Sequence, residues 1–142
     1  MSVRRAVPGD GAALAALHAT VFPSGPWDEA FWETAIGAPF DRVLVLGDPP
    51  RGFALFRIVG ADADLLTIGT RTPGEGDGKS LLETIVIDAA AEGVESLFLD
   101  VSVANKAAST LYRSAGFAKV ATRDRYYADG SDALVMRLDL TT

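Results

Sequence analysis

The sequence LFLDVSVANKAASTLYRSAGF fills residues 97–117 and decides the fold of this chain. Its apolar first part, 97–101, predicts a strand that ends in the carboxylate of Asp100. Asn105 is of a residue type favoured at helix N-caps, and the helix that it opens carries Tyr112 before a glycine stops it. This order can bring an acid, an amide and a phenol to the rim of one cleft.

Strand and helix patterns alternate along the rest of the chain. Apolar residues at helical spacing predict helices over 10–21, 27–36, about 79–91 and 105–115. Short apolar runs bounded by glycine, proline or aspartate predict strands over 3–7, 43–46, 52–59, 63–68, 97–101, 117–122 and 133–140. Three consecutive strands favour antiparallel pairing, and a strand–helix–strand unit favours a parallel crossover. The expected fold class is therefore α/β (mixed α+β), with a mixed, mostly antiparallel central sheet and helices on both faces.

Length and composition predict one soluble domain. The chain has 142 residues, of which 49% are hydrophobic and 23% charged, an ordinary balance for a globular protein with a real core. The sequence contains no internal repeat, low-complexity tract or linker long enough to divide it. We therefore expect a single domain over 1–142.

Charge and residue usage exclude several classes of function. The net charge of −6 disfavours nucleic-acid binding, which needs a surplus of lysine and arginine. Without cysteine, and with one histidine, no metal site is expected and no cysteine nucleophile exists. No apolar run reaches the roughly 18 residues of a membrane helix, and the start does not read as a signal peptide. A cytoplasmic protein without membrane or nucleic-acid partners is the expectation.

A glycine-rich loop, GEGDGK at 74–79, follows a predicted strand and opens a predicted helix. Glycines let backbone N–H groups approach an anion, and a helix N-terminus adds partial positive charge. Lys79 adds a full charge. A flexible turn without a ligand explains the pattern equally well, and the carboxylates of Glu75 and Asp77 would repel a phosphate.

The three polar residues of segment 97–117 each have an ordinary structural explanation. Asp100 is either a general base or a solvated strand end. Asn105 is either a hook for a ligand amide or only a helix cap. Tyr112 is either a proton donor or a packed ring with its hydroxyl at the rim. Each residue taken alone favours the structural explanation.

Several aromatic and basic residues outside that segment are expected to pack in the core, to line a strand end or to face solvent. We assign His18, on the apolar side of the first helix, to packing. Tyr126 and Tyr127 are either a packed pair at a strand end or part of a substrate rim. Arg123 and Arg125 are expected to face solvent.

Taken together, the motifs resemble the GNAT superfamily of N-acetyltransferases, and within it the ribosomal-protein-alanine N-acetyltransferase branch. The resemblance covers nearly the whole chain and rests on the pattern Asn-x-x-Ala-x-x-Leu-Tyr-x-x-x-Gly-Phe from Asn105 to Phe117. The Tyr126-Tyr127 pair and the run Asp-Ala-Leu-Val-Met at 132–136 point to the branch.

The resemblance implies a role for each candidate site residue. Acetyl-CoA is the implied cosubstrate, without a metal. Asp100 falls on the family's general base and Tyr112 on its general acid. The residues that fall on acetyl-CoA-binding positions are Ile68, Gly69 and Thr70 on a strand, Gly74, Gly76, Gly78 and Lys79 in the pyrophosphate loop, and Asn105.

The chain departs from the family pattern in three respects. Pro73 occupies the place of an arginine or glutamine at the start of the pyrophosphate loop, and the loop is about two residues shorter. Glu75 and Asp77 stand where neutral or basic residues are usual. Asp100 replaces a glutamate, which retracts the carboxylate by one methylene.

The first functional hypothesis is an acetyl-CoA-dependent N-acetyltransferase acting on the N-terminal α-amine of a protein such as a ribosomal protein. Such an amine has a pKa of about 7.7–8.0 and needs only modest help from a base. A net charge of −6 suits a basic protein partner. A small-molecule amine N-acetyltransferase is the second hypothesis. A GNAT-fold binding or regulatory protein with weakened CoA affinity is the third, and the acidic loop favours it. The oligomeric state is left open.

Overall fold

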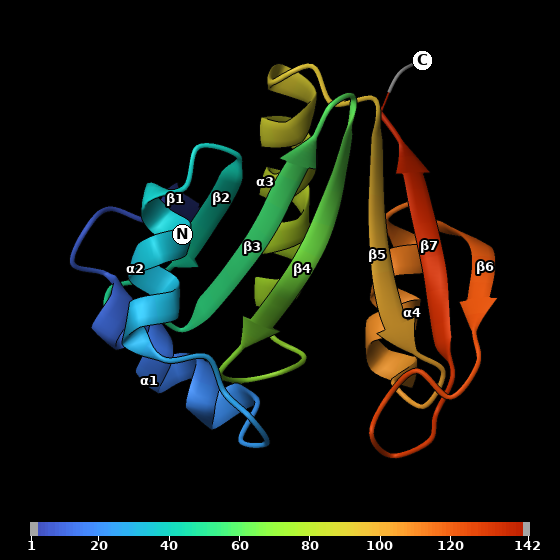
Figure 1. The fold of residues 1–142 in the computed structure, drawn as a ribbon, viewed down its shortest axis with the longest axis horizontal. Coiled ribbons are helices and arrows are strands. Elements are labelled where there is room, and N and C mark those ends of the chain that lie inside the picture. Colours follow the sequence, from blue (N-terminus) through green and yellow to red (C-terminus); the bar gives the residue numbers. More distant parts are fainter. Residues whose placement is uncertain (1–2, 141–142) are drawn as a thin grey trace.

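The computed structural model describes residues 3–140, and a seven-stranded sheet forms its centre (Figure 1). The strands are β1 (Val3–Arg5), β2 (Asp41–Leu46), β3 (Gly52–Val59), β4 (Asp62–Thr70), β5 (Ser96–Ser102), β6 (Ala118–Arg123) and β7 (Ala133–Asp139). The helices are α1 (Gly11–Val21), α2 (Glu29–Gly37), α3 (Asp77–Ala91) and α4 (Lys106–Ser114). The expected order of strands and helices is confirmed.

The strands lie in the order β1-β2-β3-β4-β5-β7-β6. Each neighbouring pair is antiparallel except β4 and β5, which α3 connects in a parallel crossover. The expected mixed, mostly antiparallel sheet is therefore confirmed.

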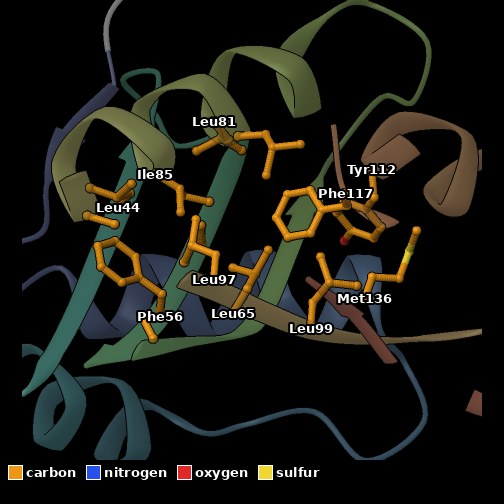
Figure 2. Close-up of a cluster of buried hydrophobic side chains, with 14 of the residues drawn as sticks. Leu44, Phe56, Leu65, Leu81, Ile85, Leu97, Leu99, Tyr112, Phe117 and Met136 are labelled. Carbon is orange, nitrogen blue, oxygen red and sulfur yellow. The ribbon is translucent and has the colours of Figure 1, made fainter. Parts of the chain in front are cut away.

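Helices cover both faces of the sheet, as expected. Alternate side chains of β2 and β3 divide between two cores, since successive strand residues point to opposite faces. Val43 and Phe53 pack against α1 and α2, whereas Leu44 and Phe56 pack against α3. Figure 2 shows the second core, which extends through Leu97 and Leu99 of β5 toward α4.

Local capping explains two of the helix boundaries. The predicted helix over 27–36 begins at Glu29 instead, because the side chain of Asp28 accepts a hydrogen bond from the backbone N–H of Phe31 at 2.9 Å. Helix α3 ends as expected before Gly93, whose φ of +82° suits a left-handed residue after a helix.

Two other boundaries differ near the candidate site. β5 continues to Ser102, so Asp100 lies inside the strand and pairs with Val135 of β7. Helix α3 begins at Asp77, two residues before the predicted start, after a left-handed Gly76. No helix within residues 3–140 is long and apolar enough to cross a membrane.

Candidate active site

β4 and β5 stop pairing halfway along their length. Their parallel register runs from Asp62 with Ser96 to Leu65 with Leu99 and ends there. Beyond that point β4 pairs only with β3, and β5 only with β7 (Figure 1). The strand edges that face each other past Leu65 therefore keep backbone groups available to a ligand.

A β-bulge lies where the two strands part. Leu65 pairs with Phe56 and Thr67 pairs with Leu55, so Leu66 is an extra residue on β4. Bulges bend a strand and re-aim its groups, and they are frequent beside active sites. The bulge thus turns the backbone of β4 at the point where the space between the strands begins.

A cavity of about 280 Å³ fills the space between the separated strands. Its walls come from the end of α1, from β4 and β5, from the start of α4, and from the segment between β6 and β7. The lining residues are Phe22, Leu65, Leu66, Thr67, Ile68, Leu99, Asp100, Val101, Ser102, Asn105, Ala108, Tyr112 and Tyr127. Asp100, Asn105, Tyr112 and Ile68, four of the residues predicted from sequence, therefore meet in one cavity.

Tyr112 is the most buried polar group of this cavity, with 7% of its surface exposed. Its ring packs edge-on against Phe117, 5.8 Å between centroids (Figure 2). Within residues 3–140 its hydroxyl has no hydrogen-bond partner. Burial, and then the neighbouring Tyr127, raise the pKa of Tyr112 to about 12, so the phenol keeps its proton at neutral pH.

Asp100 lies across the cavity on β5 and keeps 29% of its side chain exposed. The guanidinium Nε of Arg123 lies 3.5 Å from its Oδ1. Arg123 was expected to face solvent only. About half of the Arg123 side chain is exposed, as expected, but the sequence did not predict its pairing with Asp100 across β7.

Asn105 caps α4 and leaves part of its amide free. Its Oδ1 accepts a hydrogen bond from the backbone N–H of Ala108 at 3.1 Å. The two N–H groups of the amide make no hydrogen bond in the described part of the chain. The sequence offered helix capping and ligand binding as alternative roles for Asn105. The two roles are compatible, because Oδ1 caps the helix and the amide nitrogen stays free for a ligand.

The three strand residues predicted to bind the cosubstrate lie in different surroundings. Ile68 lines the cavity, whereas Gly69 and Thr70 pair with β3 outside its lining. Gly69 packs under Phe53, where an added Cβ would come within 2.6 Å of the ring carbon Cζ. Glycine at 69 therefore serves the packing of β4 on β3.

The glycine-rich loop lies at the N-terminus of α3, outside the lining of the cavity. Gly74 and Gly76 have φ of +84° and +82°, and an added Cβ at either would meet open space. Gly78 faces α4, with Leu111 3.3 Å from the site of an added Cβ. Lys79 lines a separate groove of about 640 Å³ between α3 and α4.

Asp77, which is expected to repel a phosphate at this loop, lies in an ion pair. Its side chain is buried at 4% exposure and points away from solvent toward Arg51, whose Nε lies 3.1 Å from Oδ2. The ion pair neutralises the carboxylate beside the N-terminus of α3. Glu75 is exposed in the loop.

We expect Arg51→Ala to lower the free energy of unfolding by about 1–3 kcal/mol, because it leaves the buried Asp77 carboxylate without its partner. Urea unfolding measures the loss. Arg51→Ala combined with Asp77→Asn removes both charges and should recover part of the stability. Equal stability of Arg51→Ala and the parent protein would contradict this role.

Sequence reasoning missed Phe22, which brings the segment after α1 to the cavity. An aromatic cluster holds this segment in place. The ring of His18 stacks on Trp27 at 4.9 Å, and its Nδ1 accepts the backbone N–H of Trp27 at 3.0 Å. Burial lowers the pKa of His18, so the ring is neutral, and its predicted packing role is confirmed.

Within residues 3–140 no group of three histidine, cysteine, aspartate or glutamate side chains could hold a metal ion. The polar groups that line the cavity are a carboxylate, an amide, phenols, hydroxyls and the free backbone of two strands. Such a set can accept a proton from a nucleophile, stabilise a developing oxyanion and donate a proton to a leaving group.

Comparisons with known proteins agree with this geometry. No family model matches the chain. The ribosomal protein bS18-alanine N-acetyltransferase of Salmonella typhimurium is 34% identical over 125 residues, which are 82% of each chain. The N-alpha-acetyltransferase RimI of Mycobacterium tuberculosis is 34% identical over 140 residues, 92% of this chain and 87% of the relative.

Solved structures share the fold. The crystal structure of the ribosomal-protein-S18-alanine N-acetyltransferase from Escherichia coli superimposes with a TM-score of 0.87 and 27% identity, covering 99% of this chain and 94% of that one. Arabidopsis thaliana NAA60 in complex with a bisubstrate analogue has the same fold, with a TM-score of 0.85 at 19% identity, over 97% of each chain. The chain therefore belongs to the GNAT superfamily, is an N-acetyltransferase, and within the superfamily resembles the ribosomal-protein-alanine branch.

Proposed function

We propose that this N-acetyltransferase transfers the acetyl group of acetyl-CoA to the N-terminal α-amine of a protein, with a ribosomal protein as the acceptor. The observation that carries the proposal is the cavity between β4 and β5, where Asp100 and the protonated Tyr112 line one space. Relatives named for the alanine of a ribosomal protein support the choice of acceptor.

The residues present suit acetyl-CoA. Its thioester arm would lie between β4 and β5, where Ile68 lines the cavity and the strand edges are unpaired. The free amide N–H groups of Asn105 would donate to the arm's carbonyl groups. The open backbone at Gly74 and Gly76, together with the N-terminus of α3, would hold the pyrophosphate. The pairing of Asp77 with Arg51 removes one charge that would oppose it.

Asp100 acts as the general base in this proposal, through a water molecule because its side chain is one methylene short of the family's glutamate. The neutral α-amine forms the new C–N bond to the acetyl carbon, and Asp100 accepts through the water the one proton that the nitrogen loses as the amide forms. A backbone N–H of the bulged β4 stabilises the oxyanion.

Tyr112 donates its proton to the sulfur as the C–S bond breaks, and the products are an acetylated amine and a free thiol. Its high pKa does not prevent the transfer. The same burial that raises the pKa of the phenol also raises the basicity of a desolvated thiolate.

The dual use of Asn105 gives a direct prediction. Asn105→Asp keeps an oxygen that caps α4 but exchanges the amide N–H donors for a negative charge. We expect the stability to change little and the Kd for acetyl-CoA, measured by calorimetry, to rise roughly 10-fold. Asn105→Ser, another good cap, is the control for the negative charge, because it also lacks the amide N–H groups but adds no charge. Unchanged affinity in Asn105→Asp would show that the amide N–H groups of Asn105 do not bind acetyl-CoA.

An acceptor panel tests the proposed function. Peptides with N-terminal alanine, serine or methionine are compared with polyamines and aminoglycosides at saturating acetyl-CoA. The proposal predicts the highest kcat/KM for a peptide, most of all for the alanine terminus. Faster turnover of the small amines would favour a small-molecule N-acetyltransferase and would overturn the choice of a protein acceptor.

A further inference from the structure

A second, larger hollow of about 600 Å³ adjoins the cavity between β4 and β5. It lies on the side of β5 and β7 that α1 and α2 leave uncovered (Figure 1). The two spaces share five lining residues: Leu65, Leu66, Leu99, Asp100 and Tyr127. Tyr112, with 7% of its surface exposed, lines the inner cavity, and the shared lining lets an acceptor that reaches this cavity extend into the outer hollow.

The outer hollow holds two carboxylates, Asp64 and Asp100, and one cation, Arg123. Arg123 is committed to Asp100 at 3.5 Å, and its guanidinium carbon lies 5.6 Å from the ring centroid of Tyr126. Within residues 3–140 Asp64 has neither an ion pair nor a hydrogen bond. The hollow thus contains one carboxylate without a counter-charge.

The cation opposite Asp64 on β3 is already paired. Arg57 is its register partner on β3, but its guanidinium is bound at both ends to Asp41, at 2.7 and 3.2 Å. Burial and the charges of Asp100 and Asp62 raise the pKa of Asp64, against a smaller effect of Arg57. Asp64 is exposed in the hollow, so its carboxylate can meet a ligand that brings its own positive charge.

We propose that Asp64 selects acceptors that carry a second positive charge close to the reacting amine, in particular a basic side chain on the second residue of the acceptor. The inference rests on the proposed function, since it assumes that the reacting amine lies at Asp100. Asp64 is then a specificity-determining residue of the outer hollow.

The register sets the spacing that such an acceptor must span. Asp64 pairs with Phe98, and Asp100 follows two residues later on the same side of β5. At about 4.8 Å between strands and about 3.3 Å per residue, the two Cα atoms are roughly 8 Å apart. A lysine or arginine at the second position of an extended peptide can bridge this span, and a monoamine cannot.

The test uses two peptides that differ only at the second residue, Ala-Lys and Ala-Gln, at saturating acetyl-CoA. The parent enzyme should prefer the lysine peptide about 10-fold in kcat/KM, mainly through KM. Asp64→Asn should abolish the preference without changing the rate for the glutamine peptide. Asp62→Asn removes a neighbouring carboxylate outside the hollow and should keep the preference. Asp64→Lys should reverse it in favour of an Ala-Glu peptide.

Spermidine and butylamine extend the test to small amines that carry a second charge or lack one. If no peptide is acetylated but spermidine is preferred only with Asp64 present, the role of Asp64 stands and the protein acceptor fails. An equal lysine preference in the parent enzyme and Asp64→Asn would overturn the inference and leave the proposed function intact. Absence of any charge preference in the parent enzyme would overturn it as well.

Discussion

Tyr112→Phe should lower kcat by about 100-fold or more while changing KM for acetyl-CoA by less than about 2-fold. The substitution removes one oxygen from a side chain that is 93% buried and has no hydrogen-bond partner in the described residues, so packing against Phe117 is preserved. In the proposed mechanism, only the donation of a proton to the leaving sulfur is lost. Steady-state kinetics on an alanine-terminated peptide measures the effect.

Tyr126→Phe is the matched control for that experiment. Tyr126 lines the outer hollow, is about half exposed, and is absent from the lining of the inner cavity. Its hydroxyl should be dispensable for the chemical step, so kcat should stay within about 3-fold of the parent value. Equal kcat in Tyr112→Phe and the parent enzyme would remove Tyr112 from the acid role.

Trp32→Ala should lower the free energy of unfolding by about 3–5 kcal/mol, a large share of the stability of a domain of this size. Trp32 is fully buried and packs edge-on against His18, Trp27 and Phe53, with ring centroids 5.6–5.7 Å apart. The substitution opens a void beneath the segment that carries Phe22 to the cavity. Urea unfolding followed by far-ultraviolet circular dichroism measures the loss.

Trp32→Phe separates packing from hydrogen bonding in the same position. Among residues 3–140, the buried indole Nε1 of Trp32 finds no hydrogen-bond partner. Its removal therefore costs no polar contact, and we expect Trp32→Phe to lose only about 1–2 kcal/mol. Similar losses for the alanine and phenylalanine variants would contradict a role based on ring packing.

Local sequence patterns were sufficient to predict the order of strands and helices. The strand Gly52–Val59 agrees with its predicted bounds. Helix boundaries were less accurate: helix α2 begins at Glu29 after its Asp28 cap. Helix α3 begins at Asp77, whose carboxylate pairs with Arg51, 26 residues before it. Nothing local to the glycine-rich loop reveals this pairing.

The candidate site was predictable for residues that carry a local pattern, and less so for residues that the sheet brings together. Asn105 and Tyr112 belong to one local motif, and the helix that this motif forms brings both residues to the same cavity. Arg123 reaches Asp100 only because β7 lies between β5 and β6. The position of Asp64 follows from strand alternation: it lies between the buried Ala63 and Leu65, which places it on the uncovered face.

Mass spectrometry of two peptides tests the central claim most directly. One peptide has a free N-terminal alanine and no lysine, and the other has a blocked N-terminus and an internal lysine. With acetyl-CoA and the folded enzyme, the account predicts one acetyl group on the α-amine of the first peptide and none on the second. No transfer to the α-amine, or transfer to the lysine alone, would contradict it.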